Sequence, residues 1–122
     1  MAGAKILVCE DEYGSHKAIS DILNKKGYEV YGAVDGQDAI EKAKEIGPDL
    51  ILMDIRMPKI DGLEAAREIR RNDAGVKIIF LTAFKSPELS LEANKYDISD
   101  YIIKPASPEL ILESVSRALS EN

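Results

Sequence analysis

Short apolar runs alternate along the chain with longer segments in which apolar residues recur every three or four positions. Short apolar runs bounded by turn residues predict buried strands. One of them, Leu50–Met53, has no polar position, which is typical of a parallel strand covered on both faces. The five predicted strands are Ile6–Cys9, Tyr28–Val34, Leu50–Met53, Val76–Leu81 and Tyr101–Ile103.

The segments between these runs have the spacing of amphipathic helices. In the first, Ile19 and Leu23 fall on one face, and Gly27 can take the left-handed conformation that ends a helix. Gly47-Pro48 ends the second helix, and Ser-Pro pairs start the last two with an N-cap hydroxyl and a first-turn proline. The predicted helices begin near Gly14, Gly36, Gly62, Pro87 and Pro108.

The strands and helices form five successive pairs, a pattern typical of an α/β domain with a parallel sheet and right-handed crossovers. We therefore predict a single doubly wound (βα)5 domain with helices on both faces of the sheet. We expect this domain to span residues 1–122, because no linker or repeat interrupts the pattern. It is also compatible with the N-terminal part of a longer protein.

Composition narrows the function classes. Apolar residues make up 45% of the chain and charged residues 31%, which argues for a folded globular protein. The net charge is −6, so the chain lacks the basic surface that direct nucleic-acid binding requires. No apolar run approaches the length of a membrane span, the N-terminus lacks a signal-peptide core, and Cys9 is the only cysteine. We therefore expect a cytoplasmic protein without disulfides or a membrane anchor.

Reactive side chains follow four of the five predicted strands. Glu10 and Asp11 follow the first strand, Asp54 the third, Thr82 the fourth and Lys104 the fifth. Ligand sites of parallel α/β sheets lie at the carboxyl ends of the strands, so these groups should meet at one edge. Clustered carboxylates suit Mg²⁺, or Mn²⁺ in its place. A carboxylate can also attack phosphorus, while an ammonium and a hydroxyl hold the phosphoryl oxygens.

These motifs together resemble the receiver domains of bacterial two-component response regulators, the CheY-like family. The resemblance implies a sheet with strand order 2-1-3-4-5. No one segment is specific by itself, but all occur in the family's order and at its spacing. The matching segments are Ile6–Glu12, Asp54–Pro58, Asp61-Gly62, Leu81–Ala83 and Asp100–Pro105.

The resemblance also implies how the site works. Asp54 would accept a phosphoryl group from a sensor histidine kinase or a histidine phosphotransfer protein. Asp11 would bind Mg²⁺ directly, Glu10 mainly through water, and the backbone carbonyl of Arg56 would be a further ligand. Thr82 and Lys104 would hold the phosphoryl oxygens. The domain would not be an enzyme with its own substrate, and it would lose its phosphoryl group slowly.

Signal output would follow from the same resemblance. Tyr101 would turn inward when Thr82 is drawn to the phosphoryl group, and the Lys104–Pro105 bond would be cis. The output surface would bind a downstream protein or effector domain, and the phosphorylated form could dimerise. That surface would comprise Ser86–Tyr96, Asp100–Ile103 and Ser107–Leu119.

The chain departs from the family pattern at four positions. Glu10 stands where aspartate is commoner, so we expect altered metal geometry. Arg56 and Phe84 stand where side chains tune phosphoryl lifetime, and a cationic Arg56 with a bulky Phe84 predicts slow dephosphorylation. Asp97 replaces the usual glycine after the fourth helix, which predicts a left-handed residue and a weak helix end.

Three alternatives remain open at this stage. The fold could be an interaction scaffold without phosphorylation. It could be a phosphohydrolase of the haloacid dehalogenase type, although Arg56 stands where those enzymes carry a second aspartate. It could be a flavodoxin-like carrier, although acidic residues replace the phosphate loop. Each group also has an ordinary structural explanation, and we expect His16 and Arg70-Arg71 to be solvated surface.

Overall fold

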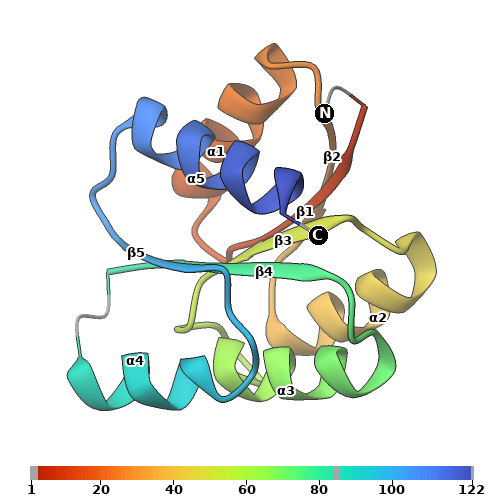
Figure 1. The fold of residues 1–122 in the computed structure, drawn as a ribbon, viewed down its shortest axis with the longest axis vertical. Helices are drawn as coiled ribbons and strands as arrows, with labels where there is room; N and C mark the ends of the chain where they lie inside the picture. Colours follow the sequence, from red (N-terminus) through yellow and green to blue (C-terminus); the bar gives the residue numbers. More distant parts are fainter. Residues whose placement is uncertain (1–2, 84–85, 122) are drawn as a thin grey trace.

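The computed structural model, which describes residues 3–83 and 86–121, is a three-layer α/β sandwich. A central sheet separates α1 and α5 on one face from α2, α3 and α4 on the other (Figure 1). The strands are β1 (Lys5–Cys9), β2 (Glu29–Ala33), β3 (Leu50–Met53), β4 (Lys77–Thr82) and β5 (Asp100–Ile103). The helices are α1 (Tyr13–Lys25), α2 (Gly36–Ile46), α3 (Gly62–Asn72), α4 (Pro87–Asn94) and α5 (Pro108–Ser120).

All five strands are parallel, in the order β2-β1-β3-β4-β5. The predicted fold class and strand order are therefore confirmed. The register pairs Cys9 with Met53 and Met53 with Phe80, while Thr82 pairs with Ile103. The carboxyl ends of β1, β3, β4 and β5 consequently reach one edge of the sheet.

Two hydrophobic cores lie on opposite faces of the sheet, because successive strand residues point to opposite sides. Leu7, Ile51 and Phe80 belong to the core under α2, α3 and α4. Their neighbours Val8 and Leu52 belong to the core under α1 and α5. The strand Leu50–Met53 is buried at every position, as its composition predicts.

The predicted starts of α2, α3, α4 and α5 are confirmed by their capping contacts, whereas α1 begins one residue before the predicted Gly14. The side chains of Asp35, Asp61, Ser86 and Ser107 each accept a hydrogen bond from a backbone N–H in the first turn. Gly27 (φ 94°) and Gly47 (φ 62°) end α1 and α2 in the left-handed region. Asp97 also adopts a left-handed conformation, with φ 57°, as predicted, while the weak end of the fourth helix stays a prediction.

The prediction that His16 is solvated surface is wrong. The His16 ring is half-buried, and its Nδ1 lies 2.9 Å from the carbonyl oxygen of Glu10. A Cβ atom at Gly32 would lie only 2.6 Å from its Nε2, so the glycine on β2 makes room for the ring. His16 therefore packs α1 against β1 and β2.

The same prediction is also wrong for Arg70. Its guanidinium donates hydrogen bonds to the backbone carbonyls of five residues in two loops. These acceptors are Asp73, Ala74, Val76, Tyr96 and Asp97, at 2.6 to 3.2 Å. Arg71 does behave as predicted, since it is exposed and pairs with Glu68 on the same helix. Within the part of the chain described, no helix has the length and apolar character needed to cross a bilayer.

Candidate functional site

Four strand ends bring the predicted groups together at one edge of the sheet. Glu10 follows β1 and Asp54 follows β3, and the Asp54 amide donates to the Cys9 carbonyl at 3.0 Å. Thr82 closes β4, and its carbonyl accepts from the Lys104 amide at 2.8 Å. These two hydrogen bonds extend the parallel pairing just past the ends of the strands. They fix the backbone positions from which the side chains of Asp54 and Lys104 enter the site.

Three carboxylates form an acidic cluster. Glu10, Asp11 and Asp54 each present an oxygen, and these oxygens lie within 4.8 Å of one another. Glu10 is buried at 3% exposure, Asp54 is half-buried, and Asp11 is exposed. A set of hard oxygen donors with one side open to water is what Mg²⁺ prefers. The residues present therefore fit a magnesium ion.

Lys104 supplies the positive charge of this cluster. Its Nζ donates to Glu10 Oε1, to Ser15 Oγ at 3.1 Å and to Asp54 Oδ2 at 3.3 Å. Partial burial acts to lower the pKa of Lys104, but its hydrogen bond to Glu10 and the charge of Asp54 outweigh burial and raise it. Lys104 therefore stays charged and bridges two of the three carboxylates.

Two residues of the α1 N-terminus, Glu12 and Ser15, adjoin the site, and neither was predicted as a site residue. Glu12 is the N-cap of α1, and its carboxylate accepts from the amides of Gly14 and Ser15. The Ser15 hydroxyl donates to Glu10 Oε1 at 3.0 Å. The role of Glu12 could have been found from its position just before a predicted helix. The contact between Ser15 and Lys104 could not, because these residues are 89 positions apart in the sequence.

The backbone on either side of Asp54 is fixed by close packing. Asp54 Oδ1 accepts from the Arg56 amide at 3.2 Å. A Cβ atom at Gly62 would lie 2.3 Å from the Asp54 carbonyl oxygen and 2.8 Å from Ile55 Cα. Only glycine therefore allows the start of α3 to approach the strand end that carries Asp54.

The predicted switch residues lie on neighbouring strands. Thr82 is fully buried. Tyr101 is half-buried, and its ring centroid lies 6.1 Å from that of Phe80 with a tilt of 59°. Burial, and then the charge of Asp54, raise the pKa of Tyr101. The Lys104–Pro105 peptide bond is cis. Phe84 lies outside the described residues.

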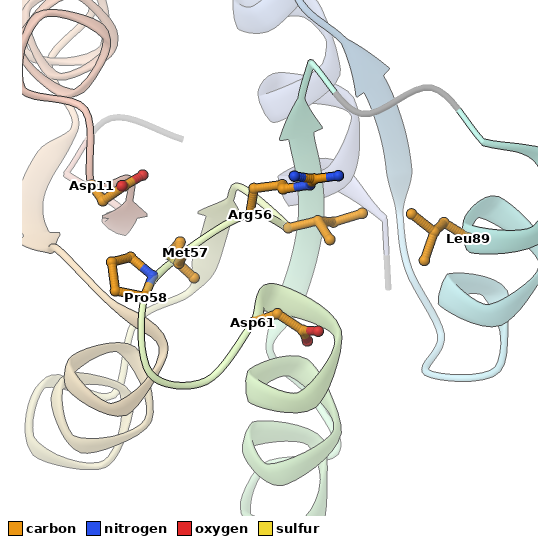
Figure 2. Close-up of a pocket in the computed structure, with 7 residues that line it drawn as sticks. Asp11, Arg56, Met57, Pro58, Asp61 and Leu89 are labelled. Atoms are coloured by element: carbon orange, nitrogen blue, oxygen red, sulfur yellow. The ribbon is translucent and has the colours of Figure 1, made fainter.

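A cavity of about 490 Å³ opens beside the acidic cluster (Figure 2). Figure 2 shows Asp11 at one side of it and Leu89 of α4 at the other, with Arg56 and Met57 between them. A second, mainly apolar cavity of about 440 Å³ is lined by Lys104 and Ser15 together with residues of α1 and α5. Lys104 therefore stands between the acidic cluster and the α1–α5 side of the molecule.

Comparison with known proteins agrees with this geometry. The family model of the response regulator receiver domain matches residues 6–116. The chemotaxis protein CheY of Thermotoga maritima is 37% identical over 116 residues, covering 94% of this chain and 97% of that protein. The regulatory protein AtoC of Escherichia coli is 35% identical over 115 residues, but this chain covers only 25% of it.

The solved structures include the same fold. A CheY-like response regulator receiver domain from Methanospirillum hungatei has a TM-score of 0.93, at 28% identity, covering 97% of this chain and 94% of that one. The match to the family model covers all five strands apart from Lys5 and reaches into α5. The chain therefore belongs to the response regulator receiver family, whose members are the phosphoacceptor modules of two-component signalling.

Proposed function

We propose that this domain accepts a phosphoryl group on Asp54 from a sensor histidine kinase or a histidine phosphotransfer protein. The observation that carries the proposal is the Lys104 ammonium, which is bonded to Asp54 Oδ2 and Glu10 beside an oxygen-only acidic cluster. A cation held against a half-buried carboxylate is placed to neutralise charge on a transferring phosphoryl group.

The chemistry is a displacement at phosphorus. An oxygen of Asp54 attacks, the phosphorus–nitrogen bond of the donor phosphohistidine breaks, and the leaving imidazole keeps the bonding electrons. Mg²⁺, or Mn²⁺, held by Asp11 and Asp54, by Glu10 through water and by the Arg56 carbonyl, would supply additional charge neutralisation. Lys104 and the Thr82 hydroxyl would hold the phosphoryl oxygens of the product.

Phosphorylation would then favour one of two arrangements of the output surface over the other. The new group adds about −1.5 to −2 charge and strong acceptor oxygens next to Thr82 and Lys104. Movement of Thr82 would vacate space for Tyr101, which packs against the core from the adjacent strand. The surface formed by α4, β5 and α5 would transmit the change to a downstream protein, an effector domain or a second copy.

β5 and α5 would move together in such a switch. Asp100 at the start of β5 accepts a hydrogen bond from the buried Ser114 hydroxyl at 2.6 Å. Arg117 of α5 lies 3.6 Å from the same carboxylate. These contacts favour one rigid β5–α5 unit, with α4 as the separate element.

Asp54 as the acceptor is tested by intact mass after incubation with acetyl phosphate and Mg²⁺. We expect a gain of one phosphoryl group in the wild type and no gain in Asp54→Ala. Equal gains in both proteins would assign the phosphoryl group to another residue. No gain in the wild type, with no structural response to beryllofluoride, would favour the interaction-scaffold alternative.

The phosphoryl lifetime is a second part of the proposal. The exposed Arg56, together with Phe84, is expected to slow attack by water, so dephosphorylation would be slow and no turnover of small phosphoesters would occur. Replacing both residues by alanine should shorten the half-life of the phosphorylated protein about tenfold or more. The half-life is followed by mass after the phosphodonor is removed, and an unchanged value would contradict this role.

The cellular setting follows from the same features. The acidic net charge argues against direct nucleic-acid binding by this domain, and the reduced Cys9 suits the cytoplasm. The chain covers 97% of the Thermotoga maritima CheY but only 25% of the regulatory protein AtoC. We propose residues 1–122 as a receiver unit that works alone or as the N-terminal part of a longer protein.

A further inference from the structure

The Ser15 hydroxyl lies at the junction of the groups proposed to carry phosphoryl transfer. It donates to Glu10 Oε1 at 3.0 Å and accepts from Lys104 Nζ at 3.1 Å. A carboxylate accepts only and an ammonium donates only, so the direction of both bonds is fixed by the chemistry of the partners. Ser15 thus connects α1 to the ammonium that contacts Asp54.

The local sequence fixes the place of this hydroxyl. Ser15 lies in the first turn of α1, and its amide donates to the N-cap carboxylate of Glu12 at 2.8 Å. The Glu12 amide in turn donates to Glu10 Oε2 at 3.1 Å. The turn between β1 and α1 is therefore closed by hydrogen bonds at both ends, which fixes the backbone position of Ser15.

The Lys104 ammonium has three N–H donors, and it donates to three acceptors in this site. They are Glu10, Ser15 and Asp54, which stand on three different segments of the chain. A lysine side chain is a flexible stem with a point charge at its end, so its position depends on the number of fixed partners. Without the serine oxygen, the ammonium is held by the two carboxylates alone.

We propose that Ser15 is a positioning residue for phosphoryl transfer, because its hydroxyl, itself bonded to Glu10, holds the Lys104 ammonium in register with Asp54. This inference rests on the proposed function. It predicts that loss of the hydroxyl lowers the maximal rate of transfer, because misplaced charge stabilises the transition state less well. It also predicts that the affinity for Mg²⁺ changes little, because Asp11 and Asp54 retain their oxygens.

The test uses Ser15→Ala, Ser15→Thr, Lys104→Ala and the double variant Ser15→Ala/Lys104→Ala, with Ser20→Ala on the same helix as control. Transfer from acetyl phosphate is followed by intact mass at saturating Mg²⁺, and Mg²⁺ binding is followed by calorimetry. We expect Ser15→Ala to lower the maximal rate about tenfold, the scale of one hydrogen bond to a charged group. Ser15→Thr should restore most of the rate, since the adjoining cavity has room for its methyl group.

The double variant separates positioning from a general structural effect. If Ser15 acts through Lys104, the double variant should transfer as slowly as Lys104→Ala and no slower. An additional tenfold loss in the double variant, a wild-type rate in Ser15→Ala, or a slow but stably folded Ser15→Thr would each overturn the inference. Alanine has a higher helix propensity than serine, so Ser15→Ala is expected to fold.

A measurement without phosphorylation keeps this inference distinct from the proposed function. The Lys104 ammonium should give a sharp, slowly exchanging ¹⁵N signal in the wild type, assigned by its loss in Lys104→Ala. We expect that signal to broaden in Ser15→Ala and to return in Ser15→Thr. An unchanged signal would overturn the positioning role even if Asp54 is phosphorylated, whereas phosphorylation of Asp54→Ala would refute only the proposed acceptor.

Discussion

Adjacent residues at the end of β1 have very different environments. Cys9 and Glu10 are almost fully buried, at 1% and 3% exposure, while Asp11 is open to solvent. Burial favours a neutral Cys9, whereas Glu10 is buried as the partner of Lys104. The burial and the charge state of each side chain at this edge therefore depend on the direction in which it points from the end of the strand.

Cys9 provides a prediction at the residue scale. Burial, and then the charge of Asp38, raise the pKa of the Cys9 thiol. Above about pH 8.5 the unfolded chain loses the thiol proton while the native protein keeps it, so the native state binds more protons and stability falls as pH rises. The Cys9 contribution to stability is complete below that pH.

The Cys9 contribution is measured by urea unfolding between pH 8 and 10. We expect the free energy of unfolding to fall less steeply with pH in Cys9→Ala than in the wild type, by up to about 1.4 kcal/mol per pH unit. The native thiol should also resist a disulfide reagent until the protein unfolds. Equal slopes, or rapid labelling of the native protein, would contradict a buried neutral thiol.

At the scale of elements, Arg70 fastens the α3–β4 loop to the α4–β5 loop. Its five hydrogen bonds go to backbone carbonyls, two of them at Tyr96 and Asp97 beyond the end of α4. Asp97 is held there in a left-handed conformation that costs energy for a non-glycine residue. These bonds tie the segment that follows α4 to the end of α3.

Arg70→Ala should lower the free energy of unfolding by about 2 to 3 kcal/mol, because several carbonyls lose a charged donor. The matched control is Arg71→Ala, which removes an exposed pair with Glu68 and should cost about 0.5 kcal/mol or less. Both are measured by urea unfolding. Hydrogen exchange should also accelerate in 95–99 for Arg70→Ala only. Equal costs for the two variants would argue against this role of Arg70.

Gly62 controls how closely α3 approaches Asp54. Because an added Cβ would meet backbone atoms at 2.3 and 2.8 Å, Gly62→Ala must shift either α3 or the strand end. We expect a loss of about 3 kcal/mol of stability, the upper range for overpacking, and slower phosphorylation. Gly75→Ala, whose Cβ would meet its nearest neighbour at 3.6 Å, is the control and should be tolerated. Unfolding midpoints and acetyl phosphate rates measure both effects.

At the scale of the whole molecule, we expect the acidic cluster to make stability depend on a cation. Glu10, Asp11 and Asp54 place three carboxylates beside one ammonium, that of Lys104. At a hundredfold excess of Mg²⁺ over its dissociation constant, binding to the native state alone adds about 2.7 kcal/mol. We therefore expect Mg²⁺ to raise the unfolding temperature, and removal of Mg²⁺ by EDTA to reverse the rise.

The cation dependence is checked by thermal unfolding with two variants at constant ionic strength. Asp11→Ala should be at least as stable as the wild type in EDTA, because repulsion is relieved, and should gain little from Mg²⁺. Glu45→Gln, an exposed carboxylate on α2, should respond to Mg²⁺ as the wild type does. The same Mg²⁺ response in all three proteins would place the cation elsewhere.

Much of the fold could be predicted from the sequence because its signals are local. Hydrophobic periodicity located all five strands and helices, and cap residues such as Ser86 and Ser107 marked where helices begin. Parallel strands gather their carboxyl ends, so the proximity of Asp54, Glu10 and Lys104 also followed from the order of elements. These features depend on neighbours in the chain and on rules that hold for any sheet of this type.

Only the tertiary structure decided the remaining contacts. Arg70 and Arg71 are adjacent and chemically identical, yet only Arg70 faces the loops, because a helix turns successive side chains by about 100°. Ser15 and Lys104 meet across 89 positions, and His16 fills the space above Gly32. The sequence by itself determined the elements, their class and the chemistry of the strand ends. The packing of helices on the sheet decided which polar side chains join the site, because those contacts depend on distances between segments that no local pattern records.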